Sequence, residues 1–220
     1  IGDRRQRQMC IRDRFKPINF SELLSSNEIR IEFWRRKFGI DNEISDAKPN
    51  VGHNTIAKLV AEGKVKKIIT QNIDNLHQVS GVSSDKVIEL HGNNTYAKCL
   101  SCNERYEIED IKREFFQTNN APECRLCGGI IKTATISFGQ AMPEKEMIEA
   151  QKATLECDLF IAIGSSLQVY PAAGFPLLAK RNGSNLIILN REPTDLDGYA
   201  DLTLNYEIGN FFDKVFSIIN

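Results

Sequence analysis

Apolar residues recur every three or four positions in two stretches of the first third of the chain, residues 27–38 and 53–65. This spacing is typical of amphipathic helices. In the first stretch, the apolar positions on one helical face are Ile29, Phe33, Trp34 and Phe38. In the second, Gly63 ends the pattern as a stop signal. We therefore predict two helices here, and we expect the aromatic face of the first to pack into a core.

After residue 65 the pattern changes to short and nearly continuous apolar runs, which are typical of strands buried on both faces. These runs are residues 65–70, 86–90, 158–164, 185–190 and 201–205. Helical patterns follow at 143–157, 171–183 and 208–219, and Pro176 is expected to disturb the second of them. The alternation predicts an α/β fold, a Rossmann-like and mostly parallel sheet with helices on both faces.

Residues 95–132 interrupt this alternation because they are polar, lack a long apolar run and contain two cysteine pairs. We interpret them as a zinc-ribbon insert. The sheet domain then comprises residues 15–94 and 133–220, and its part 15–62 is a mostly helical module.

Composition and charge narrow the class of protein. The chain has 220 residues, 41% of them hydrophobic and 26% charged, as in ordinary globular proteins. A net charge of −1 gives no reason to expect nucleic-acid binding. No apolar run approaches the ~18 residues of a membrane span, and no secretory apolar segment follows the first residues. We expect a cytoplasmic protein without direct nucleic-acid or membrane contacts.

The cysteine pairs are the strongest single motif in the sequence. The pattern is Cys99-x2-Cys102, then 21 residues, then Cys124-x2-Cys127. Two such turns supply four thiolates, which suit a tetrahedral Zn²⁺, and a small polar insert needs a metal to fold. Four cysteine ligands leave no open coordination position, so the zinc is expected to be structural. Two disulfides or a redox dithiol pair are the alternatives.

The first fourteen residues are compositionally unusual, with five Arg and two Gln and no regular periodicity. One interpretation is a disordered basic tail. The other is a junction that replaces lost sequence. Cys10 in this stretch and Cys157 farther on are interpreted as free thiols, with Cys157 in the core.

Polar sequences follow several of the predicted strands. QNIDNLH follows residue 70, HG follows residue 90, SSLQVYP follows residue 164 and NREPTD follows residue 189. Each one alone could be a turn, a loop or surface. Because carboxyl ends of parallel strands gather ligands, the set together indicates a nucleotide site. His91 could be a structural histidine, but an imidazole at a strand end is well suited to act as a general base.

Taken together, these stretches resemble the sirtuin family of NAD-dependent protein-lysine deacylases. The matching strings are TQNIDNLH, VIELHG, the two CxxC pairs, ISFGQAMP, IAIGSSLQVYPAAG and ILNREPT. They occur in the family's order across about residues 65–220.

The resemblance implies a role for each matching residue. His91 would be the general base. The nicotinamide and ribose region would be lined by Gln71, Asn72 and Asp74, with Ile73 in the nicotinamide pocket. The adenosine half would meet Gly164, Ser165, Ser166, Asn190, Arg191, Glu192 and the backbone of Ile208. Phe138 and Gly139 would border the acyl-lysine tunnel, and the peptide would pair between that stretch and the loop after Leu167. Cys99, Cys102, Cys124 and Cys127 would hold one structural zinc.

The implied reaction consumes NAD as a co-substrate and acts on acylated lysine in proteins or peptides. The acetyl oxygen would attack the ribose carbon as nicotinamide leaves, and His91 would deprotonate the ribose hydroxyl that attacks the resulting imidate. The products would be free lysine, nicotinamide and O-acyl-ADP-ribose. Two alternatives stay open: a protein ADP-ribosyltransferase on the same fold, and a non-catalytic zinc-containing binding module.

The sequence also departs from the family pattern. The glycine-rich turn that cradles the cofactor phosphates and the Asp-Phe-Arg segment are not found before residue 60. The chain therefore looks truncated, and we predict that these 220 residues bind NAD weakly or not at all. Gln140 stands where Glu is usual and Ser165 where Thr is common. A Tyr-x-x-Arg pair for acidic acyl groups is not found around Trp34 to Arg36, which favours deacetylation.

Overall fold

A computed structural model describes residues 17–44 and 47–219 of the chain. The predictions about residues 1–14, including Cys10, lie outside the described residues. The chain divides into two compact units. One consists of the described part of Ile1–Ala47 together with Gly92–Met142, and the other of Lys48–His91 together with Pro143–Asn220. This division differs from the predicted one, because the first helices group with the cysteine-containing segment and not with the parallel strands.

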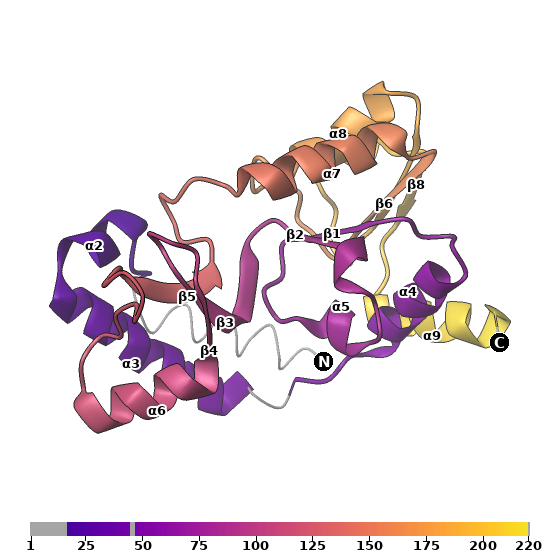
Figure 1. The fold of residues 1–220 in the computed structure, drawn as a ribbon. Coiled ribbons are helices and arrows are strands. Elements are labelled where there is room, and N and C mark those ends of the chain that lie inside the picture. Colours follow the sequence, from indigo (N-terminus) through magenta and orange to yellow (C-terminus); the bar gives the residue numbers. More distant parts are fainter. Residues whose placement is uncertain (1–16, 45–46, 220) are drawn as a thin grey trace. The chain divides into compact units, whose positions relative to one another are not determined.

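The first unit is built on a small antiparallel sheet. Its strands are β3 (Gly92–Cys99), β4 (Arg105–Glu107) and β5 (Ile131–Thr135), in the order β4-β3-β5. Its helices are α2 (Phe20–Ser25), α3 (Asn27–Ile44) and α6 (Ile108–Thr118) (Figure 1). A capping box at Asn19 and Glu22 starts α2.

The core of this unit joins α3 to the cysteine-containing segment. Trp34 and Phe38 are 0% and 1% exposed, and their rings stack with centroids 5.4 Å apart. Ile111 and Phe115 of α6 are buried in the same cluster, and Phe115 lies 5.6 Å from Phe38. The expected core-facing role of the aromatic face is confirmed. The polar segment does have an apolar face of its own, because α6 buries residues at helical spacing.

The second unit contains the parallel strands that the apolar runs predict. They form two sheets: β1 (Ile68–Thr70) with β2 (Val87–Glu89), and β6 (Leu159–Ile163) with β7 (Asn185–Leu189) and β8 (Leu202–Leu204). All the pairings are parallel. Every strand is shorter than its apolar run, and β1 begins three residues late. The predicted parallel α/β architecture is confirmed.

Helices follow or separate these strands, and all but the short one at Leu76–Val79 overlap stretches that the sequence predicted to be helical. They are α4 (Val51–Ala61), α5 (Leu76–Val79), α7 (Glu144–Glu156), α8 (Gly174–Arg181) and α9 (Ile208–Ile219), with short 3-10 turns at Ser84–Lys86 and Asp197–Tyr199. The expectation that Pro176 disturbs its helix is wrong. Pro176 lies in the first turn of α8, where backbone N–H groups have no intrahelical partner.

Packing within this unit fixes the elements around the strand ends. Phe212 of α9 lies against α4, so that a Cβ on Gly52 would be 3.2 Å from its ring. Lys67, just before β1, donates to Glu149 of α7 at 2.5 Å and to the Asp85 carbonyl. In the part of the chain that the structure describes, no helix is long and apolar enough to cross a membrane.

Candidate functional site

One group of predicted site residues lies where β1 and β2 end. Residues 71–74 follow β1, and the loop is shaped by its own polar groups. The Thr70 hydroxyl accepts the Asn72 N–H at 3.0 Å, and the Asp74 carboxylate accepts the Leu76 N–H at 3.0 Å. Asn72, Ile73 and Asp74 are exposed, whereas Gln71 is half-buried. The loop thus presents exposed side chains from a backbone that is fixed by hydrogen bonds.

His91 lies beside this loop at the end of β2. The Leu90 N–H donates to the Thr70 carbonyl at 3.0 Å, which extends the pairing of the two strands to the residue before His91. The His91 Nδ1 atom lies 3.1 Å from the Gln71 carbonyl oxygen. A carbonyl can only accept, so Nδ1 carries a proton, and in the neutral ring the lone pair is then on Nε2. The ring is thereby held in the tautomer that a general base requires.

A second group of predicted residues lies where β6, β7 and β8 end. The Gly164 N–H donates to the Leu189 carbonyl at 2.9 Å, and the Asn190 N–H donates to the Leu204 carbonyl at 3.1 Å. Gly164 has a φ of +65°, and a Cβ there would lie 2.7 Å from the Ile208 Cδ1 atom. The structure therefore brings Gly164 and Ile208 into direct contact, although 44 positions separate them in the sequence.

The polar side chains of this second group are already engaged. The Asn190 side chain is buried and donates to the Glu192 carbonyl at 2.7 Å. Arg191 bridges Glu192 at 3.0 Å and Glu207 at 3.2 Å. The Ser165 hydroxyl accepts the Leu167 N–H at 3.2 Å, whereas Ser166, the next residue, is exposed. Each of the two groups is ordered by contacts within one unit.

The residues expected to meet the acylated peptide have different surroundings. Phe138 is 66% exposed, and its carbonyl accepts the Phe20 N–H at 2.9 Å. Gly139 has a φ of +78° in a turn closed by Gln140, whose side-chain oxygen accepts the Ser137 N–H at 3.1 Å. Leu167 is only 6% exposed within an apolar cluster. Its side chain is therefore part of the core, and only its backbone could meet a peptide.

The four paired cysteines converge in the first unit. The Sγ atoms of Cys99, Cys102, Cys124 and Cys127 all lie within 4.8 Å of one another. The Cys99–Cys127 and Cys102–Cys124 sulfurs are 3.5 and 3.6 Å apart, and all four cysteines are free thiols. A Zn–S bond of about 2.3 Å places the sulfurs of a tetrahedron about 3.8 Å apart. The cluster therefore fits one zinc ion, whereas a disulfide needs about 2.0 Å.

Neighbouring groups direct hydrogen bonds at these sulfurs. The Ser101 N–H lies 3.4 Å from Cys99 Sγ, and the Tyr106 hydroxyl lies 3.2 Å from Cys124 Sγ. The hydrogen bond from Tyr106 lowers the pKa of the Cys124 thiol, which favours the thiolate that binds metals. A Cβ on Gly129 would lie 2.8 Å from Cys99 Sγ, so glycine is required at this approach.

Two charged or titratable features were not anticipated from the sequence. Lys132 on β5 is 1% exposed, and burial lowers the pKa of its ammonium group to about 8. Its Nζ donates to the Thr133 carbonyl at 3.3 Å and to the Thr135 carbonyl. His53 and His77 pack with ring centroids 5.0 Å apart, and burial lowers the pKa of His77. Nothing in the sequence around Lys132 indicated that its side chain is buried.

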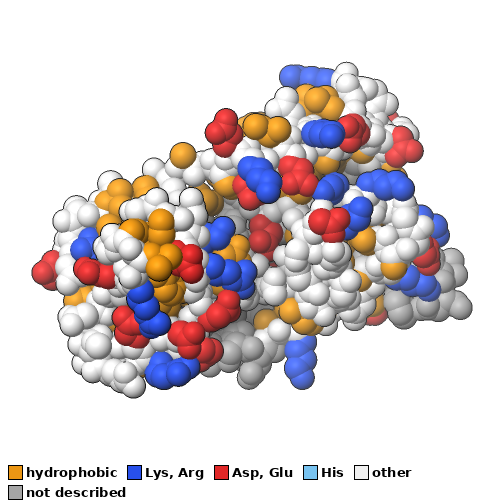
Figure 2. Space-filling model, viewed as in Figure 1, with side chains coloured by type: hydrophobic (Ala, Val, Ile, Leu, Met, Phe, Trp, Pro, Cys, Tyr) orange, Lys and Arg blue, Asp and Glu red, His pale blue; other side chains and the backbone are white. Residues whose placement is uncertain are grey.

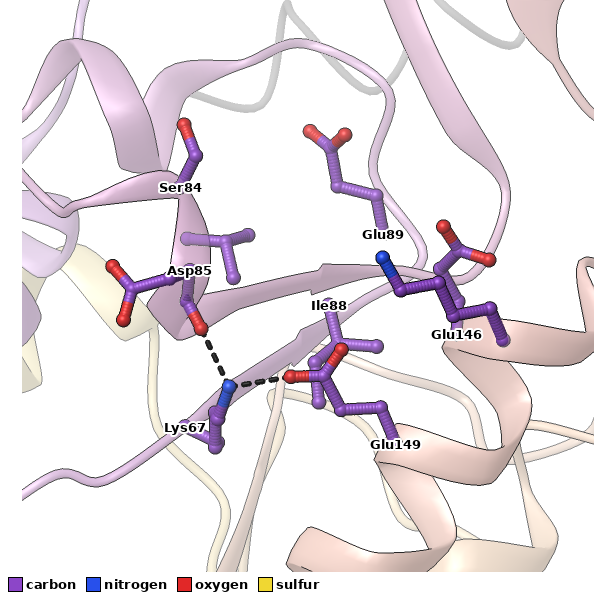
Figure 3. A pocket seen from close by; sticks show the side chains of 9 residues that line it. Lys67, Ser84, Asp85, Ile88, Glu89, Glu146 and Glu149 are labelled. Atoms are coloured by element: carbon purple, nitrogen blue, oxygen red, sulfur yellow. Dashed lines mark hydrogen bonds and ion pairs between the residues drawn. The ribbon is translucent and has the colours of Figure 1, made fainter.

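A cavity of about 420 Å³ lies elsewhere in the second unit, between the strands β1 and β2 and the helix α7. Figure 3 shows Lys67 bridging the Asp85 carbonyl and Glu149 at its wall. None of its lining residues belongs to the predicted site. The contacts of Lys67 hold α7 against the strands. On the face seen in Figure 2, positive and negative side chains are interspersed.

Comparison with known proteins gives consistent matches over most of the chain. The family model described as the Sir2 family matches residues 5–171. The "NAD-dependent protein deacetylase 1" of Bradyrhizobium diazoefficiens is 53% identical over 196 residues, which cover 89% of this chain and 77% of that protein. The "NAD-dependent protein deacetylase" of Rhodopseudomonas palustris is 52% identical over 89% of this chain and 78% of its own length.

Solved structures match as well. The structure described as "Sir2-p53 peptide-NAD+" has 35% sequence identity and a TM-score of 0.76, over 88% of this chain and 83% of that one. The structure described as "Sir2 bound to acetylated peptide" has 35% identity and a TM-score of 0.77, over 88% and 84%.

Proposed function

Because the chain belongs to the Sir2 family, we propose that it is an NAD-dependent protein deacetylase, which consumes NAD and removes acetyl groups from lysine. Relatives more than 50% identical bear that name. The observation in this chain that supports it best is the fixed tautomer of His91, whose Nδ1 is held by the Gln71 carbonyl at 3.1 Å. A free Nε2 at a strand end is what proton removal from a sugar hydroxyl requires.

In this proposal His91 acts as the general base. When bound, NAD supplies an electrophilic ribose carbon and a neutral leaving group, nicotinamide. The Nε2 atom of His91 accepts the proton of a ribose hydroxyl, and the Gln71 carbonyl stabilises the imidazolium that forms, because it accepts from Nδ1–H in both charge states. Gln71 thus has a backbone role in addition to any contact of its side chain.

The remaining residues of the two strand-end groups bind and orient the co-substrate. We assign the nicotinamide and ribose region to the exposed loop of Asn72, Ile73 and Asp74, next to Gln71. We assign the adenosine half to the ends of β6 and β7 and the start of α9: Gly164, Ser165, Ser166, Asn190, Arg191, Glu192 and the backbone of Ile208. The close approach of Gly164 to Ile208 supports a common position for these two residues, because a Cβ at Gly164 would lie 2.7 Å from the Ile208 Cδ1 atom.

The four cysteines would hold one zinc ion with a structural role. Four thiolates complete its coordination, so the ion cannot bind a substrate directly. The acylated lysine would meet Phe138 and Gly139, with the backbone at Leu167 as the other candidate contact. A cytoplasmic location stays a prediction.

Product analysis tests the reaction. An acetylated peptide and NAD are incubated with the chain, at several millimolar NAD because weak affinity is predicted. Mass spectrometry is expected to find deacetylated peptide, nicotinamide and an acetyl-ADP-ribose in equal amounts. A peptide or protein that gains an ADP-ribose mass instead would favour the transferase alternative. Absence of all products at enzyme concentrations near those of the substrate, from protein that calorimetry shows to bind NAD, would contradict the proposal.

The affinity for NAD is tested separately by calorimetry. We predict a dissociation constant in the millimolar range or no measurable binding, because the chain has no Gly-x-Gly turn whose backbone N–H groups could bind the pyrophosphate. Micromolar affinity would refute this prediction and leave the assigned reaction intact.

A further inference from the structure

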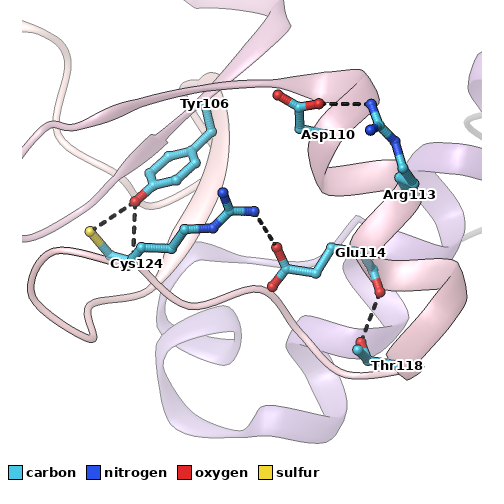
Figure 4. Close-up of polar contacts among 7 residues, drawn as sticks. Tyr106, Asp110, Arg113, Glu114, Thr118 and Cys124 are labelled. Atoms are coloured by element: carbon cyan, nitrogen blue, oxygen red, sulfur yellow. Dashed lines mark hydrogen bonds and ion pairs between the residues drawn. The ribbon is translucent and has the colours of Figure 1, made fainter.

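The Tyr106 hydroxyl makes two hydrogen bonds at the cysteine cluster, both drawn in Figure 4. It lies 3.2 Å from Cys124 Sγ, and it lies 3.0 Å from the backbone nitrogen of Arg125. A backbone N–H can only donate, so the hydroxyl oxygen accepts from Arg125. The hydroxyl proton is then free to point at the sulfur. The geometry therefore makes Tyr106 the donor and Cys124 the acceptor.

The position of this hydroxyl is set by elements other than the loop that it contacts. Tyr106 lies on β4 opposite Ala97 of β3, two residues before Cys99. Its ring packs against the buried apolar cluster of the first unit. Cys124, in contrast, lies beyond α6 in the second CxxC turn. The hydrogen bond thus joins the second cysteine turn to the strand pair that carries the first.

The charge of a four-thiolate site explains why such a donor matters. One Zn²⁺ with four thiolates has a net charge of −2, and hydrogen bonds to charged sulfur stabilise that excess. The Ser101 N–H at Cys99 is a donor of the same kind. Groups that hold and orient metal ligands change metal affinity or activity by roughly 10–100-fold when they are removed.

We propose that Tyr106 is a positioning residue of the metal site. Its hydroxyl holds the Cys124 thiolate in place between the two cysteine turns, screens the excess charge and slows the release of zinc. This inference rests on the proposed zinc site. A purely structural tyrosine would contribute through its ring alone, and Tyr106→Phe separates the two because it keeps the ring and removes the hydroxyl.

The test measures zinc release from the full chain. The metal content is first determined by atomic absorption, and the protein is then challenged with an excess of a chromogenic chelator. We expect Tyr106→Phe to release zinc about tenfold faster than the wild type. We expect its circular dichroism spectrum to be unchanged.

Two matched variants control this experiment. Tyr96→Phe removes a hydroxyl from the neighbouring strand β3, where the ring lies 4.0 Å from the Arg105 guanidinium. Arg125→Ala removes the exposed ion pair with Glu114 but keeps the backbone N–H that contacts Tyr106. Both should release zinc within twofold of the wild-type rate.

The outcomes separate the two levels of the proposal. A wild-type chain that never holds zinc would overturn the zinc site, and the role of Tyr106 with it. A wild-type chain that holds one zinc, with Tyr106→Phe releasing it at an equal rate, would overturn only the role of Tyr106. If Tyr106→Phe does not fold, the hydrogen bond is tested in wild-type protein loaded with cadmium. A ¹¹³Cd–¹H correlation spectrum should show the Tyr106 hydroxyl proton coupled through Cys124 Sγ, and its absence would contradict the proposal.

Discussion

The cysteine cluster and the strand-end residues are two sites built in opposite ways. The cluster draws its ligands from two turns within 29 residues, and each turn brings two sulfurs together by local geometry. The strand-end residues come from loops after β1, β2, β6 and β7, and no motif within a single loop defines them. Parallel strands gather the residues of each group, because β1 and β2 end at one edge of their sheet, and β6, β7 and β8 at one edge of theirs. The first site depends on spacing in the sequence, whereas the second depends on the topology.

The two sites also differ in what stabilises them. Cys99 and Cys124 of the cysteine cluster are buried in the apolar core of the first unit, and the proposed metal would add a cross-link between the two cysteine turns there. The strand-end groups lie on parallel strands whose buried residues, such as Leu186 and Ile188, form an apolar cluster of their own. Loss of the metal should therefore affect the first region far more than the second.

Replacement of a metal ligand gives the largest expected effect. Cys99 is buried, and Cys99→Ser removes one of four thiolates. We expect zinc content to fall from one ion per chain to nearly none. Hydrogen exchange should then show loss of protection in β3, β4 and β5, while β6, β7 and β8 stay protected. Structural zinc contributes on the order of 10 kcal/mol in small modules.

Cys157→Ser is the control, because Cys157 lies outside the cluster and donates to the Thr154 carbonyl. Equal protection of both regions in Cys99→Ser, with zinc lost, would show that the metal does not support the first unit.

Gly92→Ala should cost more than about 3 kcal/mol of unfolding free energy. Gly92 follows His91 directly, has a φ of +72°, and a Cβ there would lie 1.9 Å from the Ala134 carbonyl oxygen. The backbone at Gly92 or at Ala134 must move to make room for this Cβ. Gly63→Ala is the matched control, with a φ of +73° and only the end of a lysine side chain within 4 Å. It should cost about 1 kcal/mol, and similar costs in both variants, measured by denaturant unfolding, would show that the contact with Ala134 is unimportant.

Lys132 should make the stability of the first unit depend on alkaline pH. Its pKa is about 8 in the folded chain, against an ordinary value of 10.5. Between these values the unfolded chain binds more protons, so stability rises with pH. Relative to Lys132→Met, the wild type should gain up to roughly 3 kcal/mol between pH 8 and 10.5. A constant difference between the two proteins across this window, measured by unfolding in denaturant, would contradict the burial of a charged Lys132.

The exposed ion pair between Arg125 and Glu114 gives the smallest expected effect. The two side chains are 2.9 Å apart, but 69% and 36% exposed. Solvent screens such pairs, so Glu114→Gln should change the unfolding free energy by less than about 0.5 kcal/mol. A loss above 1 kcal/mol in thermal unfolding would mean that this surface contact helps to hold the second cysteine turn.

The sequence allowed the elements and the ligand set to be predicted, because these depend on local patterns. Apolar runs predicted all five parallel strands, and the spacing of Cys99, Cys102, Cys124 and Cys127 predicted their convergence. The sequence did not show that α6 and α3 share a core. Phe38 and Phe115 are 77 positions apart, and the apolar face of each helix does not indicate which element it packs against. The alternation of strands and helices indicated a common edge for His91 and Gln71.

Contacts that depend on exact placement could not be predicted. The bond from His91 Nδ1 to the Gln71 carbonyl requires the backbone geometry of two strand ends. The contact between Tyr106 and Cys124 joins a strand to a later turn, and neither residue type indicates the other. The close approach of Gly92 to Ala134 was likewise invisible, because a glycine after a strand also reads as a simple stop.

The central claim is that the imidazole performs the chemistry while the sulfurs support the fold. The most direct test is the rate of product formation by His91→Ala in the full chain, at saturating acetylated peptide and several millimolar NAD, with zinc content measured in the same sample. We predict one zinc per chain and a rate that falls by about 10²–10⁴-fold. Turnover within threefold of the wild type, with zinc retained, would contradict the account.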